Sequence, residues 1–282
     1  MSQTLHAGPP GLSVVRRVEA ASMRDTLHAE WTKLRTVSGP AWLLAGAIVL
    51  IVAVSAASTA AVKCPSGTAC PVDTPKLSLT GIEFGQAVVA ILAVLAICGE
   101  YSTGMIRITL TAMPRRSAVL AAKAVLVAGL ALAAGTIAVG GSLLAGRFIL
   151  PGHGFTPGRG FPLLSLAAGP TLRAAAGSVL YLALIALLSL GIAAVVRDSA
   201  VAIGIVLGLL YLSPIILSVV AGDPVWSHRL ERYAPMSAGL TVQDTIGLRG
   251  LPISPWGGLG VLAVWAAAAM LAGGLVLRLR DA

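Results

Sequence analysis

The chain has 282 residues, of which 57% are hydrophobic and only 11% are charged. Together with a mean hydropathy of +0.90, this leaves too few polar side chains to cover a water-soluble domain of this size. We therefore expect an integral membrane protein. The net charge of +9 does not indicate a nucleic-acid-binding protein, because the basic residues are scattered at the ends of apolar segments. At such positions they are typical of topology signals and lipid-headgroup contacts.

The first 40 residues precede any long apolar run. A secretory signal peptide has its apolar core much nearer the N-terminus, so we expect no cleaved signal here. Residues 1–21 are predicted to be a disordered tail, because the sequence Gly-Pro-Pro-Gly at 8–11 interrupts regular structure.

An amphipathic helix is predicted over residues 22–38. Five apolar residues recur there at helical spacing and cover an arc of about 120°: Met23, Leu27, Trp31, Leu34 and Val37. We expect this helix to lie on the membrane face, with Trp31 at the interface. Glu30 falls inside the apolar arc, where its carboxylate needs a cationic or amide partner unless it reaches water. Both alternatives stay open from the sequence.

Six apolar runs follow, each close to the roughly 20 residues that cross the hydrocarbon core as a helix. They cover residues 41–62, 82–99, 118–144, 174–196, 200–220 and 256–277. The predicted fold class is therefore an all-α integral membrane protein, with six transmembrane helices in a domain over residues 41–282 and an N-terminal amphipathic interfacial helix. Only three residues separate the fourth and fifth runs, so these two helices are predicted to be antiparallel neighbours.

The distribution of Lys and Arg predicts the orientation. Placing the N-terminus inside assigns twelve of the 20 basic residues to the cytoplasmic side and eight to the outside. This bias follows the positive-inside rule. We therefore expect a multi-pass protein with both termini in the cytoplasm.

Two of the three cysteines, Cys64 and Cys70, then lie in the first outer loop. An oxidising exterior permits a disulfide between them, and two free thiols are the alternative. A structural zinc site usually needs four ligands, and no histidine lies near this pair in sequence. We expect no metal site.

A polar hinge over residues 100–123 separates the second and third apolar runs. Glu100 and Tyr101 stand where the second run leaves the membrane, Thr103 can cap a short helix, and Pro114 would end it. Three apolar side chains of that short helix share one face: Ile106, Leu110 and Met113. Such a helix would lie along the membrane surface or against another protein.

A cationic cluster follows this short helix and indicates a cytoplasmic loop: Arg115, Arg116 and Lys123. From chemistry alone, an ordinary short loop between two transmembrane helices is the alternative. The last outer loop leaves a similar choice open, because residues 235–246 could form a re-entrant turn covered by protein or a plain surface loop.

Proton- and sodium-coupled carriers commonly need an ionisable group near the middle of the membrane. All eleven acidic residues and all four histidines fall outside the middles of the predicted helices. The sequence also has no G-x-x-x-x-G-K-[ST] phosphate loop and no H-E-x-x-H motif. We therefore expect a non-catalytic chain, so that any energy for transport comes from another polypeptide.

Three motifs together carry a family resemblance: H-A-E-W-T-K-L-R-T-V at 28–37, G-E-Y-S-T-G-M-I-R-I-T-L-T-A-M-P-R-R at 99–116, and A-P-M-S-A-G at 234–239. With them the chain resembles permease subunits of ABC transporters, in the type-2, exporter-like membrane family and particularly its actinobacterial members. The likeness extends over nearly the whole chain after residue 22.

The resemblance implies a six-helix half-transporter of the bacterial plasma membrane. It would dimerise with a second copy or a paralogue and bind two copies of a separate ABC ATPase subunit. ATP and Mg²⁺ would sit on that ATPase, so we expect no cofactor in this chain. The second expected function is a membrane accessory or anchoring subunit of another complex that transports nothing.

The resemblance also implies where coupling would occur. Residues 102–113 would be the coupling helix seated in the ATPase, with these residues contributing: Glu100, Tyr101, Thr103, Gly104, Ile106, Arg107, Leu110, Arg115 and Arg116. The helix over 22–38 would be the connecting helix, with Glu30, Trp31, Lys33 and Arg35. Separately, Gly204 and Gly208 form a GxxxG motif suited to close helix contact. This motif is a candidate dimer interface, although in so Gly- and Ala-rich a chain it can also occur by chance.

Overall fold

The computed structural model describes residues 32, 38–64, 70, 72–102, 116–159, 161, 164–220, 229 and 231–279. The predicted disordered tail lies outside these residues, and so does the predicted amphipathic helix apart from two positions. The predicted coupling helix lies outside them from residue 103 onward.

In the described ranges, six helices are long and apolar enough to cross a membrane, which confirms the predicted all-α fold with six candidate spans. They are α3 (Ser38–Ala61), α5 (Ile82–Ser102), α7 (Arg116–Ile149), α8 (Gly169–Val196), α9 (Ser199–Val220) and α12 (Pro255–Leu279). No strand occurs in the described ranges. Short helices lie in the connections between the long helices: α4 (Thr74–Ser78), η2 (Leu150–His153), η3 (Pro157–Arg159), α11 (Pro235–Leu240), η4 (Thr241–Gln243) and η5 (Leu248–Gly250).

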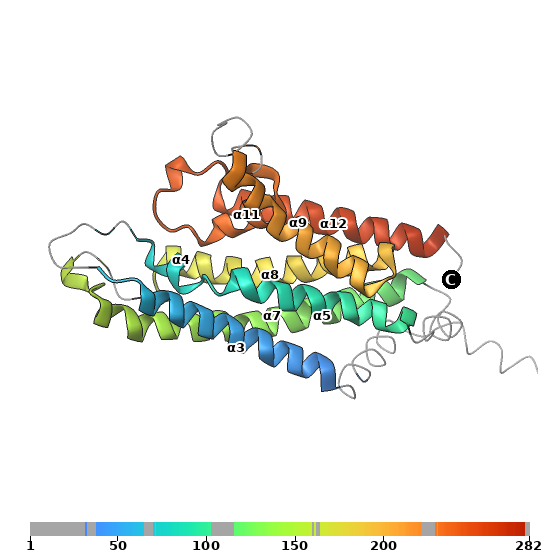
Figure 1. Ribbon diagram of the computed structural model, residues 1–282, viewed down its shortest axis with the longest axis horizontal. Helices are drawn as coiled ribbons and strands as arrows, with labels where there is room; N and C mark the ends of the chain where they lie inside the picture. The colour runs from blue at the N-terminus through green and yellow to red at the C-terminus, as the bar shows by residue number, and fades with distance from the viewer. Residues whose placement is uncertain are drawn as a thin grey trace, which may run out of the picture.

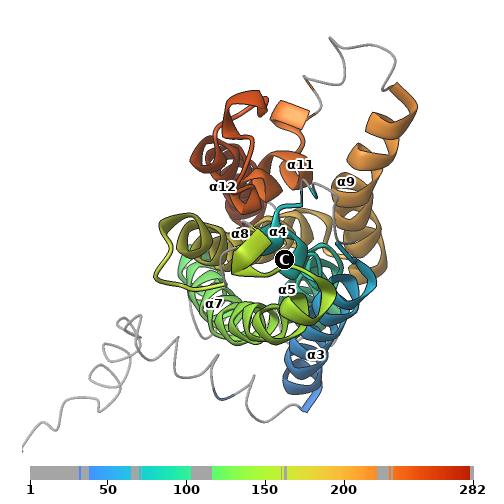
Figure 2. The ribbon, with the colours of Figure 1, turned by 90° about the vertical axis from the view of Figure 1, so that its left-hand side faces the viewer.

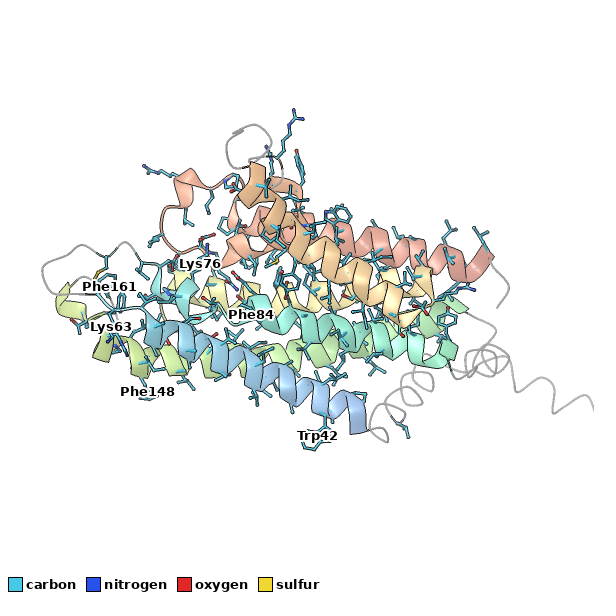
Figure 3. The ribbon with its side chains drawn as sticks, in the orientation of Figure 1. Trp42, Lys63, Lys76, Phe84, Phe148 and Phe161 are labelled. Carbon is cyan, nitrogen blue, oxygen red and sulfur yellow. A yellow bond between two sulfur atoms is a disulfide. The ribbon has the colours of Figure 1, made fainter. Side chains whose placement is uncertain are left out.

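The long helices run along the long axis of the molecule, and the chain reverses direction at each end (Figure 1). We call one end the hinge end, because it holds Tyr101, Arg116 and Arg197. We call the opposite end the disulfide end, because it holds Cys64 and Cys70. The last described residues of α12 lie at the hinge end (Figure 1). Large apolar side chains such as Trp42 of α3 and Phe148 of α7 point away from the bundle (Figure 3), as expected of lipid-facing positions.

Helices α7 and α8 extend five or more residues beyond their predicted runs, and a charged residue in each extension finds a partner. The sequence pattern ended the third run at residue 144, yet α7 continues to Ile149. Arg147 in its last turn donates to the carbonyl oxygen of Leu164 at 2.9 Å. Likewise α8 begins five residues before the predicted fourth run, and Arg173 in its second turn donates to the carbonyl oxygen of Asp244 at 2.5 Å.

Helix α8 is the centre of the bundle and packs against α12, α7, α5 and α9. It lies between these neighbours when the molecule is viewed from the disulfide end (Figure 2). Large side chains along α8 are fully buried, among them Tyr181, Ile185 and Leu190. The apolar core therefore follows α8 rather than the outer helices.

Glycines allow the close approach of α8 to α12. A Cβ atom on Gly191 would lie 2.5 Å from the carbonyl carbon of Ala269, and one on Gly273 would lie 2.8 Å from the Cβ of Ala194. Both distances are too short for non-bonded carbon atoms. Small residues serve in this way where helices pack backbone to backbone in membranes.

A tight turn joins α8 to α9 where the sequence predicted it. Arg197 ends α8 with φ of 63°, and its amide donates to the carbonyl oxygen of Ala193 at 2.9 Å. The side chain of Asp198 then accepts a hydrogen bond from the amide of Val201 at 2.9 Å, which caps the first turn of α9. Arg197 takes up a left-handed conformation that is uncommon for a residue with a side chain.

Helix α9 lies at the edge of the bundle (Figure 2) and contacts α5, α8 and α11. It contains Pro214, which removes one helical hydrogen bond. The positions of Gly204 and Gly208 are open, because a Cβ atom on either would meet nothing within 4 Å. Among the described residues, neither glycine therefore lies at a close contact with another helix.

Candidate functional site

The hinge residues predicted from the sequence fall at the junction of α5 and α7. The structure places Glu100 and Tyr101 in the last turn of α5, and Arg116 begins α7. The remaining predicted coupling residues lie outside the described part of the chain: Thr103, Gly104, Ile106, Arg107, Leu110 and Arg115. The same holds for the predicted connecting-helix residues Glu30, Trp31, Lys33 and Arg35.

Tyr101 contacts a residue that the sequence analysis did not select. The guanidinium carbon of Arg197 lies 5.5 Å from the centre of the Tyr101 ring, within the range of a cation–π interaction. Arg197 also donates from Nη2 toward the carbonyl oxygen of Val276 in α12, at 3.5 Å. The end of α5, the α8–α9 turn and the last part of α12 therefore meet at one arginine.

The end of α5 also packs directly on α8. Cys98 is 2% exposed, and its sulfur lies 4.0 Å from the carbonyl oxygen of Ala193. That carbonyl accepts the amide of Arg197 as well. Together with the contact between Tyr101 and Arg197, the contact of Cys98 with Ala193 holds the end of α5 against the end of α8.

A second set of residues, linked by polar contacts, lies between the helices near the disulfide end. We call Glu83, Gln86, Tyr181, Tyr211 and Met236 the polar cluster. Gln86 and Tyr181 are fully buried, and the Tyr181 hydroxyl donates to Oε1 of Gln86. Nε2 of Gln86 lies 3.0 Å from the carbonyl oxygen of Glu83 and 3.2 Å from the sulfur of Met236.

The hydroxyl of Tyr211 completes the polar cluster by donating to the carbonyl oxygen of Glu83. The cluster therefore joins four elements, since Glu83 and Gln86 belong to α5, Tyr181 to α8, Tyr211 to α9 and Met236 to α11. The cluster was not predicted from the sequence, because Glu83 lies outside the middle of its predicted helix and the other members are uncharged. Glu83 and Gln86, three residues apart on one helix face, were the signal that could have found it.

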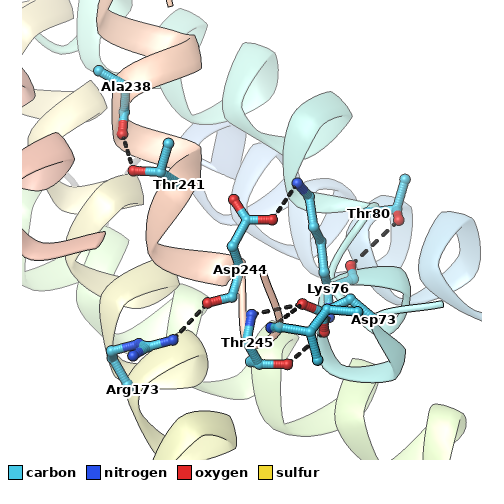
Figure 4. A network of polar contacts seen from close by, with 9 residues as sticks. Asp73, Lys76, Thr80, Arg173, Ala238, Thr241, Asp244 and Thr245 are labelled. Atoms are coloured by element: carbon cyan, nitrogen blue, oxygen red, sulfur yellow. Dashed lines mark hydrogen bonds and ion pairs between the residues drawn. The ribbon is translucent and has the colours of Figure 1, made fainter. Parts of the chain in front are cut away.

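A network of polar contacts ties the last loop to the disulfide end (Figure 4). Asp73 accepts hydrogen bonds from the amide and the hydroxyl of Thr245, each at 2.6 Å. Lys76 forms an ion pair with Asp244 at 2.6 Å, and Arg173 of α8 bonds to the carbonyl oxygen of the same residue. We call these five residues the loop clamp. They join the start of α4, the start of α8 and the last loop.

The segment before this clamp folds into the bundle. In α11 and η4, Met236, Ala238, Val242 and Gln243 are at most 7% exposed. A Cβ atom on Gly239 would lie 2.6 Å from the ring of Tyr181. This packing favours the re-entrant turn over the surface loop, because protein covers the backbone of residues 235–243.

Cys64 and Cys70 form a disulfide. The amide of Cys64 donates to the carbonyl oxygen of His153 at 2.9 Å, which attaches the first loop to the short helix that follows α7. Leu150 and Phe155 pack beside Cys64 in a small apolar cluster.

In the described ranges, no three His, Cys, Asp or Glu side chains are grouped as metal ligands. No protein-family model matches this chain, and no curated protein matches it in sequence. The geometry thus offers two sites of interest: the contact between Tyr101 and Arg197 at the hinge end, and the polar cluster near the disulfide end.

Proposed function

We propose that this chain is the membrane-spanning permease subunit of an ABC exporter. A separate ATPase would hydrolyse ATP with Mg²⁺, and the chain would couple that reaction to movement of substrate across the bacterial plasma membrane. The proposal is supported by the three sequence motifs at 28–37, 99–116 and 234–239, together with six helices able to span a membrane. It assigns the chain no catalytic residue and no cofactor of its own.

The observation that carries the proposal is the contact of Arg197 with both Tyr101 and Val276. Tyr101 directly precedes the proposed coupling segment. A force on that segment would reach α5 and α7 along the chain. Through Arg197 it would also reach the α8–α9 turn and α12. Such contacts suit a rigid-body shift of packed helices, which is a common form of transporter motion.

The assembly would contain two ATPase copies and a second permease, identical or paralogous. Gly204 and Gly208 are a candidate for part of the permease interface, because their open positions leave room for a second helix. Both termini and the hinge end would face the cytoplasm, and the disulfide end would face the exterior.

Affinity purification tests the partner. The tagged chain is isolated from its native membrane in mild detergent, with and without crosslinking, and stoichiometric proteins are identified by mass spectrometry. We expect a protein with a phosphate loop to be recovered. Arg107→Glu should abolish its recovery, whereas the matched control Arg278→Glu, on α12 outside the proposed coupling segment, should not.

The recovery of no nucleotide-binding protein after crosslinking would contradict the permease proposal and favour the accessory subunit. Glu100→Ala separates these two functions in a different way. A permease variant should insert normally but lose ATP-driven efflux, whereas an anchoring subunit should tolerate the change.

A further inference from the structure

The side chain of Glu83 occupies an unusual position at the disulfide end. It is the second residue of α5, which is one of the six candidate membrane spans. The residue is half-buried, while its neighbours Ile82, Gly85 and Gln86 are buried. A carboxylate in such a place carries a large free-energy cost unless a cation, hydrogen-bond donors or water meets it.

The hydrogen-bond donors of the polar cluster are not directed at the Glu83 carboxylate. The hydroxyl of Tyr211 donates to the carbonyl oxygen of Glu83, and that of Tyr181 donates to Gln86. The side-chain nitrogen Nε2 of Gln86 is directed at the backbone carbonyl of Glu83 and at the sulfur of Met236. Within the described residues, no hydrogen bond or ion pair reaches the Glu83 carboxylate.

A candidate counter-ion for Glu83 is also engaged. Lys76 lies close enough to Glu83 to interact electrostatically. However, its amine is ion-paired with Asp244 at 2.6 Å. The loop clamp thus holds this cation on another carboxylate, which leaves the charge of Glu83 available to a cation from outside the chain.

Exposed apolar side chains occur on α5 and α9, the two helices that the hydrogen bond from Tyr211 to Glu83 joins. Phe84 follows Glu83 directly (Figure 3), and Leu212 and Ile215 lie close in sequence to Tyr211 on α9. Each of these three side chains is more than 50% exposed. An apolar body could therefore lie against α5 and α9 while its charged group reaches the carboxylate.

We propose that Glu83 binds the cationic group of an amphiphile, such as a lipophilic ammonium or phosphonium ion. The carboxylate supplies the charge, and the exposed apolar side chains of α5 and α9 contact the body. The ligand class follows from charge, because an anion at the same place would meet an uncompensated carboxylate. That this amphiphile is a transported substrate rests on the permease proposal, whereas its binding does not.

Two ions of matched shape and opposite charge test the site. The purified chain, in nanodiscs of zwitterionic phosphatidylcholine and without any ATPase, is equilibrated with tetraphenylphosphonium or tetraphenylborate. Binding above that of empty nanodiscs is measured by equilibrium dialysis. We expect saturable binding of tetraphenylphosphonium at one site per chain. Glu83→Gln, which removes only the charge, should weaken that binding at least tenfold and should not weaken the binding of tetraphenylborate.

The matched control is Glu231→Gln, the same acid-to-amide change in the last outer loop, which should leave both affinities within twofold. Unchanged tetraphenylphosphonium binding in Glu83→Gln would overturn the proposal. Equal loss of both ions would also overturn it, because a purely structural role predicts that result.

A measurement on the unmodified protein covers the case in which Glu83→Gln does not fold. Dicyclohexylcarbodiimide reacts with carboxyl groups in apolar surroundings, and mass spectrometry locates the adduct. Tetraphenylphosphonium should protect Glu83 from labelling, and tetraphenylborate should not. Labelling of Glu83 that is insensitive to tetraphenylphosphonium contradicts the site. If binding holds but no ATPase is recovered with the chain, the permease proposal fails and the cation site stands.

Discussion

The guanidinium group of Arg197 lies over the ring of Tyr101, with 5.5 Å between its carbon atom and the ring centre. The two residues are far apart in sequence, yet this contact connects the start of the polar hinge to the shortest turn between two spans. Arg197 is the only non-glycine residue with positive φ in the described ranges. Its backbone shapes the turn and its side chain reaches α5 and α12.

The two roles of Arg197 can be separated by substitution. Arg197→Gly keeps the left-handed turn, because glycine adopts positive φ without steric cost, but removes the contacts with Tyr101 and Val276. We expect the variant to insert and to bind the ATPase normally, while ATP-driven efflux falls about tenfold, the equivalent of about 1.4 kcal/mol. Efflux from inverted vesicles or cells measures this.

Tyr101→Phe is the matched control for that contact, because it keeps an aromatic ring under the guanidinium group. It should retain most efflux, and Tyr101→Ala should behave like Arg197→Gly. Normal efflux in both Arg197→Gly and Tyr101→Ala would show that coupling does not pass through this contact.

Two glycine substitutions distinguish internal packing from an external interface. Gly191→Ala should destabilise the chain by about 1–3 kcal/mol, because the added Cβ would overlap the backbone of α12. Gly208→Ala should not destabilise it, since that position is open and alanine is the better helix former. Thermal unfolding in detergent compares the two.

A bulkier change tests Gly208 as a dimer contact. Gly208→Leu should leave the fold of the single chain intact and shift the assembly from dimer to monomer, as measured by light scattering or native mass spectrometry. An unchanged dimer would remove the GxxxG motif from the interface.

The loop clamp should depend more on Asp73 than on Lys76. Asp73→Ala removes both hydrogen bonds to Thr245 and leaves partly buried donors without a partner, at a cost of about 1–3 kcal/mol. Lys76→Gln removes an ion pair whose lysine side chain is 46% exposed, and such pairs contribute about 1 kcal/mol or less. Hydrogen exchange over residues 241–250 should rise strongly in the first variant and slightly in the second. Equal exchange in both would contradict this ranking.

The disulfide provides a test of orientation. If the disulfide end faces the exterior, reduction of intact cells followed by a membrane-impermeant maleimide should label Cys70, which is only partly buried, but not Cys98, which is buried near the opposite end. Loss of the bond should lower stability by about 2 kcal/mol, the value expected for closing a short loop. Labelling that requires permeabilised cells would reverse the proposed topology.

Much of the fold followed from the sequence because a bilayer demands long apolar helices. The six runs and the short turn at 197–199 needed no knowledge of tertiary contacts. The helix ends were less well predicted, since Arg147 and Arg173 were treated as boundaries. Each finds a backbone carbonyl elsewhere in the chain and so remains within a helix.

The candidate sites depended on contacts that sequence spacing cannot give. Gln86 meets Tyr181 across 95 residues and Met236 across 150. Nothing local to Gln86 indicates either partner. The hinge stays a prediction from composition and motif, and the structure places Tyr101 in the last turn of α5. The sequence indicates its partner Arg197 only as a residue of the short turn and as one of the basic residues that predict the orientation.

The short α8–α9 turn also bears on how the protein is made. Only Arg197 and Asp198 separate the end of α8 from the start of α9, so no longer polar loop lies between these two candidate spans. Because the turn fixes the two helices in opposite directions, we expect them to enter the bilayer as a pair. The orientation of α8 would then determine that of α9, and the charges that flank α9 would not. A topology reporter inserted at this turn would separate α8 from α9. Its result would therefore not describe the orientation of the intact hairpin.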